Sequence, residues 1–217
     1  MDSEDYQTNF HENRRMKMDA VKIVNKINKE HGTIKNVYFL ACGGSLVDLY
    51  PGYYFLRAES AVMDAQWIPA REFALTPPKK LGKDSLLIIC SHSGKTKECL
   101  EAAKVGMNAG AAVVTMTHAP GSACDTDEWI SIVYDWAPGV KEAEKPQGIV
   151  LRILNELMKI QEPGYVLYDK IAEGFDKIDE IIAAAVKDQQ NAAWLFAEKY
   201  SEEPNLYIMA SGASYSQ

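Results

Sequence analysis

Two unbroken apolar runs, each leading straight into a small polar turn, constrain the fold of this 217-residue chain more than any other feature. Residues 37–42 run into the turn 43–45, and residues 86–90 run into the turn 91–96. An apolar run without alternation is typical of a strand buried on both faces, as in parallel sheets covered by helices. The sequence therefore predicts parallel α/β units.

The same alternation of strand and helix continues along the chain. Further strands are expected over residues 112–117 and 130–134, with a weaker one over 62–67. Strands separated by helices predict a doubly wound α/β fold. The expected domain has three layers, α/β/α, around a parallel sheet of about five strands. Apolar spacing of about 3.6 residues predicts helices on residues 14–31, on 45–60 with a bend at Pro51, on 148–161, and after Thr96, where Cys99, Ala102, Ala103, Gly106 and Met107 form one stripe.

A second copy of this domain is expected to begin near the end of the chain. Residues 205–214 repeat residues 36–45 at a constant offset of 169, with five identities in ten positions, and such self-similarity indicates a repeated structural unit. Residues 166–200 are amphipathic without a strand pattern, which predicts a helical connector that packs on the first domain. The expected parts are an N-terminal helical segment (1–34), a first domain (35–162), the connector (163–203) and the start of a second domain (204–217), as in the first half of a longer protein.

Composition argues against several classes of function. The net charge is −7 and no dense run of lysine or arginine occurs beyond one face of the first helix, so no nucleic-acid partner is expected. No apolar run approaches the roughly 20 residues of a membrane span, and the acidic N-terminus is unlike a signal peptide, which predicts a cytoplasmic protein without a membrane partner. The four cysteines lack C-x-x-C spacing, and we expect structural thiols and no metal.

The polar turns after the two apolar runs predict a phosphate site. Ligands bind at the carboxyl ends of the strands in such sheets, and helix N-termini offer backbone N–H groups to anions. Helix capping is the alternative role of the Ser and Thr side chains, and the occurrence of two such turns in one unit favours the phosphate site. The expected donors are the backbone of Gly43 and Gly44 and the side chains of Ser45, Ser91, Ser93 and Thr96.

Four further polar residues have open roles. His92 lies between two serines of its turn and either adds one more donor or polarises a ligand. His118 follows the strand 112–117 and either faces the same edge of the sheet or lines a loop. Glu72, which has no partner acid, is a candidate sugar contact or fixes a helix, and Asp48 is expected to interact with the dipole of its helix.

Nucleotide-binding motifs do not fit these turns. Residues 93–96 look like the end of a P-loop, but Ile89 stands where that motif requires glycine. The turn after residue 42 lacks two glycines of a dinucleotide-binding motif, since Ser45 and Asp48 occupy their places. Neither turn matches the G-x-S-x-G nucleophile elbow.

The turns resemble those of the SIS-domain proteins, the sugar isomerase fold found in the isomerase half of glucosamine-6-phosphate synthase, over residues 35–217. Within that group, the chain is similar to the bacterial fructosamine-6-phosphate deglycases in residues 41–45 with Tyr50 and Pro51, in 90–96, in Asp135 and Trp136, and in 210–215. The resemblance implies hydrolysis of a phosphorylated sugar–amino acid, a fructosamine 6-phosphate, to glucose 6-phosphate and a free amino acid, without metal or organic cofactor. By position, the residues implied to hold the sugar phosphate are Gly44, Ser45, Ser91, His92, Ser93 and Thr96.

The resemblance implies no catalytic residue in this chain. In the family the acid/base glutamate and histidine come from the second domain, beyond Gln217, and in the first copy Leu75 stands where the histidine would follow Glu72. The 217-residue chain is therefore expected to bind phosphate with little or no deglycase activity, in a homodimer or higher homo-oligomer. The alternatives are an aldose–ketose isomerase or amino-sugar phosphate deaminase, and a non-catalytic sugar-phosphate sensor, although the helix at 14–31 lacks the partner helix of a DNA-binding motif.

Overall fold

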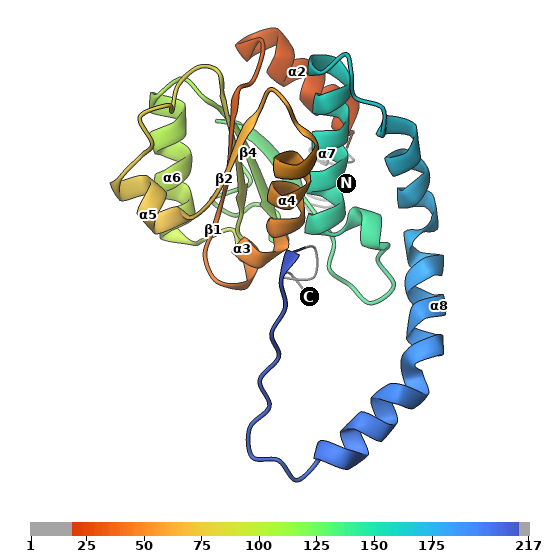
Figure 1. Cartoon of the computed structure of the whole chain (residues 1–217). Helices are drawn as coiled ribbons and strands as arrows, with labels where there is room; N and C mark the ends of the chain where they lie inside the picture. The colour runs from red at the N-terminus through yellow and green to blue at the C-terminus, as the bar shows by residue number, and fades with distance from the viewer. Residues whose placement is uncertain (1–18, 213–217) are drawn as a thin grey trace, which may run out of the picture.

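The computed structural model describes residues 19–212 and has three layers, with a parallel five-stranded sheet between two layers of helices (Figure 1). The order β2-β1-β3-β4-β5 confirms the doubly wound α/β fold. The strands are β1 (Asn36–Ala41), β2 (Asp64–Pro69), β3 (Ser85–Cys90), β4 (Ala112–Thr117) and β5 (Ile130–Val133). The helices are α2 (Ala20–His31), α3 (Gly44–Asp48), α4 (Tyr50–Glu59), α5 (Ala70–Leu75), α6 (Lys97–Asn108), α7 (Pro146–Gln161) and α8 (Tyr168–Tyr200), with a 3₁₀ turn, η1 (Glu142–Glu144).

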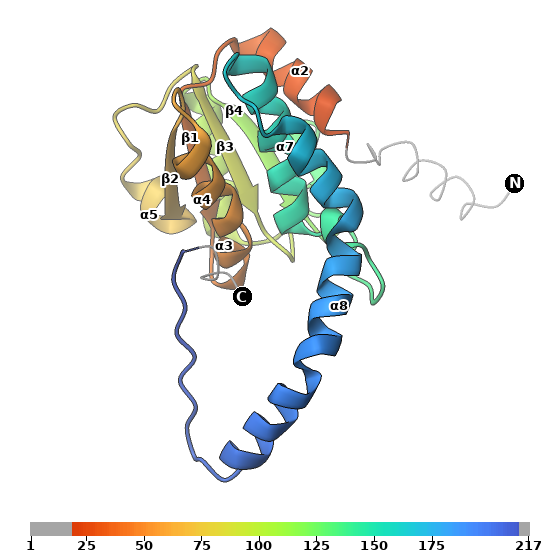
Figure 2. The same cartoon turned by 45° about the vertical axis from the view of Figure 1, so that its right-hand side comes forward.

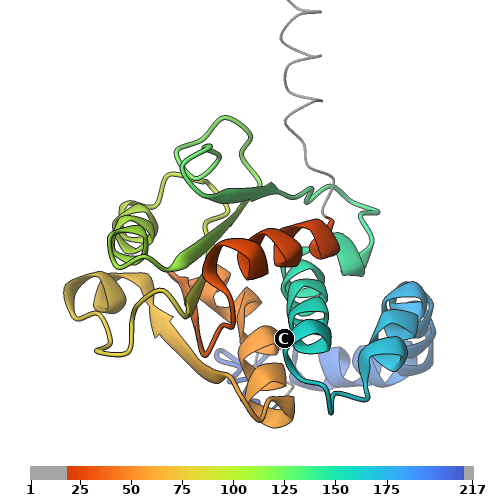
Figure 3. The same cartoon turned by 90° about the horizontal axis from the view of Figure 1, so that it is seen from above.

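The core has two halves, one on each face of the sheet. Successive side chains of a strand point to opposite faces, so Val37 and Phe39 pack under α2, α4 and α7, while Tyr38 and Leu40 pack under α5 and α6. Seen from above, these two groups of helices lie on opposite sides of the strands (Figure 3). Burial on both faces explains why the central strands are continuous apolar runs in the sequence. Within residues 19–212, no helix is long and apolar enough to cross a membrane.

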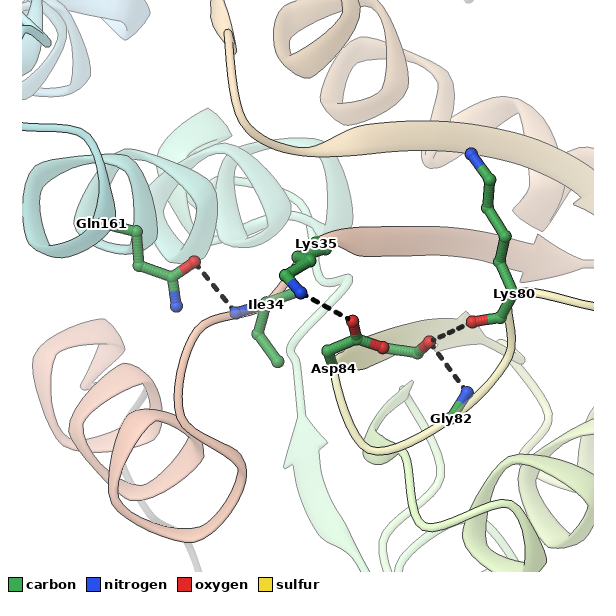
Figure 4. A network of polar contacts seen from close by, with 7 residues as sticks. Ile34, Lys35, Lys80, Gly82, Asp84 and Gln161 are labelled. Carbon is green, nitrogen blue, oxygen red and sulfur yellow. Dashed lines mark hydrogen bonds and ion pairs between the residues drawn. The ribbon is translucent and has the colours of Figure 1, made fainter.

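Polar contacts fix the amino ends of β1 and β3 (Figure 4). The backbone N–H of Ile34 donates to the side chain of Gln161 at 3.1 Å, which ties the entry of β1 to the end of α7. The Lys35 ammonium lies 3.5 Å from the Asp84 carboxylate, next to the start of β3. In the register of the pair, Asn36 lies opposite Ser85 and Ala41 opposite Cys90, so the two strands start and end at the same level.

The helix expected over residues 45–60 is two helices, separated at Leu49. Pro51 lies in the first turn of α4, where its missing N–H has no intrahelical partner to lose. It therefore starts a helix, and the predicted bend within one continuous helix is wrong. On α6, Met107 is exposed, unlike the other four members of the predicted stripe. The part of the first predicted helix before residue 19 lies outside the described residues.

The connector helix packs on the domain only over its first turns. There it contacts α7 and η1, and the Asp179 carboxylate accepts a hydrogen bond from the Glu142 N–H at 3.0 Å. No residue of α8 is buried, and Trp194 is 70% exposed. Figure 2 shows the second half of α8 projecting beyond the layers of the domain. The prediction that the whole connector packs on the domain is therefore wrong for that half.

The segment expected to start a second domain is extended and exposed. Residues 205–210 form no strand, since among the described residues they pair with no other strand. Gly212 has φ of +61°, close to the +59° of Gly43, its counterpart in the repeat. The last five residues of the chain, with the predicted Ser214 turn, lie outside the described residues.

Two tyrosines provide a test of the core with opposite expected signs. The Tyr38 hydroxyl is buried without a hydrogen-bond partner among the described residues, whereas Tyr165 donates to the side chain of Asn155. Because an unpaired buried hydroxyl costs about 1–3 kcal/mol, Tyr38→Phe should raise the free energy of unfolding by about 1 kcal/mol. Tyr165→Phe should lower it by about 1 kcal/mol. Urea titration measures both, and equal losses would contradict the unpaired state of Tyr38.

Candidate functional site

The two predicted turns lie side by side at the carboxyl edge of the sheet. Ala41 pairs with Cys90 in the register of β1 and β3, so the turns begin at the same level on strands about 4.8 Å apart. After β1 the chain crosses to β2 at one edge, and after β3 it continues toward β4 and β5. The helices that follow β1 and β3 therefore cover opposite faces. This is the topological switch point at which open α/β sheets bind ligands.

The hydroxyl groups of the turns mostly have roles other than helix capping. The Ser91 and Thr96 hydroxyls hydrogen-bond to each other at 2.8 Å, and Thr96 makes no side-chain capping bond although it is the N-cap residue of α6. Gly43 occupies the N-cap of α3, and no side chain makes a capping bond there. The Ser93 hydroxyl accepts from the backbone N–H of Lys95 at 3.3 Å, a contact within the turn. The capping alternative therefore does not describe Ser45 or Thr96.

An aromatic cluster lies directly beside the second turn. The His92 and His118 rings stack with centroids 4.9 Å apart and planes 17° apart. Nδ1 of His92 lies 3.0 Å from the Tyr134 hydroxyl, and the edge of Trp136 meets the His92 ring at 5.7 Å between centroids. Because β3, β4 and β5 are consecutive in the sheet, their carboxyl ends bring these four rings together. His118 thus faces the same edge as the two turns.

Sequence reasoning missed Tyr134 as a member of this site. It is the first residue after β5 and is 4% exposed, so its only signal in the sequence is a place at a strand end. Burial raises the pKa of Tyr134 far above its ordinary value, and it raises the pKa of Cys90 to about 12. Both groups therefore stay protonated and act as neutral hydrogen-bonding groups.

Asp48 differs from its expected role. It is the last residue of the short α3, so it does not lie in the first turn of that helix, where an acidic side chain would favour the dipole. The Gln147 amide donates to its carboxylate at 2.7 Å. Burial raises the pKa of Asp48, while the positive charge of a protonated His92 would lower it. Asp48 is thus a half-buried acid electrostatically linked to the cluster.

Glu72 lies on the helix after β2, the strand that pairs with β1. It is exposed on α5, which follows the outer strand β2, and its backbone carbonyl accepts from Thr76. Leu75, at the position where the histidine of a repeat would stand, is 64% exposed. No hydrogen bond or ion pair among the described residues joins the Glu72 carboxylate to the turns, and its contact with a sugar stays a prediction.

The cysteines are free thiols, as expected. Three are buried, and Cys42 is half-buried just after β1. Burial raises the pKa of Cys124 to about 11, and also raises that of Cys99, which makes both poor nucleophiles at neutral pH. Among residues 19–212, no three His, Cys, Asp or Glu side chains gather in a way that would hold a metal ion.

Comparison with known proteins finds relatives in both sequence and fold. The chain is 33% identical to the fructosamine deglycase FrlB of Bacillus subtilis over 183 residues, which are 84% of this chain and 56% of that protein. The fold matches a candidate phosphosugar isomerase of Salmonella typhimurium with a TM-score of 0.82 and 32% identity, over 91% of this chain and 59% of that one. A second candidate phosphosugar isomerase, from Bacillus subtilis, matches with a TM-score of 0.80 and 31% identity, over 91% and 62%. No protein-family model matches the chain.

The chain thus spans between a half and two thirds of the length of these relatives.

Proposed function

This chain belongs to the SIS-domain family of sugar-phosphate proteins, within which it resembles the fructosamine deglycases, and on that premise we propose that it is the phosphosugar-binding half of a deglycase. The whole protein would hydrolyse a fructosamine 6-phosphate to glucose 6-phosphate and a free amino acid. The observation that carries the proposal is the pairing of the two hydroxyl-rich turns at the switch point of the sheet. We further propose that the whole protein is cytoplasmic and forms a homo-oligomer.

The turns suit a phosphate monoester because they supply many neutral donors to one place. The helix α6 begins at Lys97, directly after its N-cap Thr96, and its first backbone N–H groups point toward the turn 91–96. Ser45 and Thr96 add hydroxyls that make no helix-capping bond, and Ser93 adds a third hydroxyl from the same turn. Local donors are needed because the net charge of −7 repels anions at long range. Each hydrogen bond to a charged phosphate contributes about 1.5–3 kcal/mol.

Deglycation also needs a general acid and base within reach of the reacting carbons of the sugar. We propose that a second domain supplies both, because in this chain Leu75 stands where the histidine that accompanies the glutamate would follow Glu72. The 217-residue chain would then bind glucose 6-phosphate and release none from a fructosamine 6-phosphate. Deglycation by this chain alone would contradict the division of the site.

The names of the two structural relatives favour one other activity, isomerisation of a phosphosugar. Both activities would use the same phosphate turns, so phosphate binding does not distinguish the deglycase from the isomerase. Analysis of the products that the longer protein forms does distinguish them. Release of a free amino acid from a fructosamine 6-phosphate supports the deglycase, and interconversion of an aldose and a ketose phosphate without such release supports the isomerase.

Thr96→Val tests the phosphate site, because valine keeps the shape of the side chain and removes its hydroxyl. We expect the dissociation constant for glucose 6-phosphate, measured by isothermal titration calorimetry, to rise about tenfold or more, since a hydrogen bond to a charged group contributes about 1.5–3 kcal/mol. The matched control is Thr76→Val, whose hydroxyl bonds to the end of α5, outside the turns. Equal affinity of the two variants would remove Thr96 from the site.

A further inference from the structure

The hydrogen-bond partners of the two stacked histidines determine which ring nitrogens carry their protons. Tyr134 stays a phenol because burial raises its pKa, so its O–H needs an acceptor. The two candidates are Nδ1 of His92 at 3.0 Å and the Cys90 sulfur at 4.0 Å. A ring nitrogen accepts a hydrogen bond far better than a thiol does. The Tyr134 O–H therefore points at Nδ1, and a neutral His92 carries its proton on Nε2.

His118 takes the other tautomer. Its Nδ1 lies 3.1 Å from the backbone oxygen of Tyr134. A carbonyl oxygen only accepts hydrogen bonds, so Nδ1 of His118 must carry a proton. One residue, Tyr134, thus sets both rings, accepting from His118 through its backbone and donating to His92 through its side chain. The stacking holds the two rings nearly parallel.

The consequence concerns the exposed side of His92. His92 belongs to the turn 91–96 and is an exposed residue, while its Nδ1 faces the hydroxyl of the buried Tyr134. The opposite nitrogen, Nε2, then carries an N–H donor, and His92 belongs to the same turn as Ser93 and Thr96. A neutral donor of fixed direction suits an anion in a site that otherwise consists of hydroxyls and backbone N–H groups.

We propose that Tyr134 is a positioning residue, which holds His92 as a neutral Nε2–H donor to the phosphate of a bound sugar phosphate. This role rests on the proposed function. Tyr134 does not touch the ligand and acts through His92. The stacked His118 limits rotation of the His92 ring, and the Cys90 thiol is the weak second neighbour of the Tyr134 hydroxyl.

The tautomers can be measured directly on the 217-residue chain. Labelling its four histidines with ¹⁵N and recording long-range ¹H–¹⁵N correlations at about pH 8, above the usual pKa of histidine, distinguishes Nδ1–H from Nε2–H rings. His92→Asn and His118→Asn assign the two signals by their loss. We expect Nε2–H for His92 and Nδ1–H for His118. An Nδ1–H ring at His92 overturns the proposal whatever the ligand does.

Binding then tests the role itself, with glucose 6-phosphate and inorganic phosphate as probes. Tyr134→Phe should weaken binding about tenfold and move the Nδ1 signal of His92 toward that of an unbonded nitrogen, a change that a purely structural loss would not produce in a folded chain. The matched control, Tyr168→Phe, removes a hydroxyl that bonds to Glu156 on α7, and should leave affinity unchanged. Wild-type affinity in Tyr134→Phe would overturn the proposal.

Two substitutions of His92 distinguish the roles of its two ring nitrogens. The amide of glutamine reaches the place of Nε2, whereas the shorter amide of asparagine lies near Nδ1. His92→Gln should therefore bind more tightly than His92→Asn by about tenfold, and equal losses would overturn the proposal. If the wild-type chain binds neither probe, the proposed function fails by itself, while the tautomer measurement still decides how Tyr134 and His92 are bonded.

Discussion

Replacement of Gly94 by alanine is expected to lower the free energy of unfolding by about 3 kcal/mol and to abolish sugar-phosphate binding. Gly94 has φ of +63°, a conformation that costs other residues about 1–2 kcal/mol. A Cβ at this position would lie 1.9 Å from Oγ of Ser122, 2.5 Å from its Cβ and 2.7 Å from Oγ1 of Thr117. Rotation of the Ser122 side chain can move Oγ away but leaves the other two clashes. Overpacking of this kind costs about 1–3 kcal/mol.

The effect on binding follows from the bonds that the Gly94 backbone makes. Its N–H donates to the Ser91 carbonyl at 2.9 Å, and its carbonyl accepts from the Cys124 N–H at 3.1 Å. A shift of Gly94 away from Ser122 therefore moves Ser91 and the start of α6 together. Donors displaced by about an ångström no longer converge on one phosphate, since hydrogen bonds weaken steeply with poor geometry.

Gly110→Ala is the matched control for this substitution. Gly110 has φ of +80° and nothing within 4 Å of an added Cβ, so alanine there brings only the backbone strain. We expect a loss of about 1–2 kcal/mol, with affinity for glucose 6-phosphate unchanged. Urea titration of both variants isolates the crowding at Gly94. Equal losses would show that the contact of the turn with Ser122 is not tight.

The central strands could be predicted almost to the residue, and the outer one less well. β3 and β4 are buried along their whole length, and such strands appear as unbroken apolar runs. β2 begins two residues later than expected, because it is an outer, half-exposed strand whose sequence mixes Asp64 and Gln66 with apolar residues. The break at Leu49 was not predictable from apolar spacing, since both short helices share one apolar face.

The candidate site, like the sheet, was predictable only in part. Both turns were predictable because each follows its own strand along the chain. The contact of His92 with Tyr134 was not, since it depends on β3, β4 and β5 being neighbours in register, over 42 residues of sequence. The exposure of Trp194 shows a third limit. Amphipathic spacing predicts an apolar helix face but does not say whether the same domain covers it.

Glu162 is the last residue of the predicted first domain. Its replacement by alanine is expected to destabilise the domain by about 3–5 kcal/mol. The residue is 8% exposed. One carboxylate oxygen accepts from the Ser60 hydroxyl, and the other accepts from the Ala61 N–H at 3.0 Å. These bonds join the end of α7 to the chain that leaves α4. Hydrogen bonds to charged groups contribute about 1.5–3 kcal/mol each, and alanine removes the acceptor of both donors.

Two further variants show whether the carboxylate is the cause. Glu162→Gln keeps one oxygen acceptor but turns an NH₂ group toward one of the two donors, so it should lose about half as much stability as alanine. Glu198→Ala, on the exposed part of α8, should stay within about 0.5 kcal/mol of the wild type. Urea titration gives the three free energies. A loss in Glu162→Ala as small as in Glu198→Ala would contradict the role of Glu162, and would allow the domain to end at α7. The expected loss would instead show that Glu162, the first residue after α7, belongs to the domain, because its carboxylate holds the loop between α4 and β2.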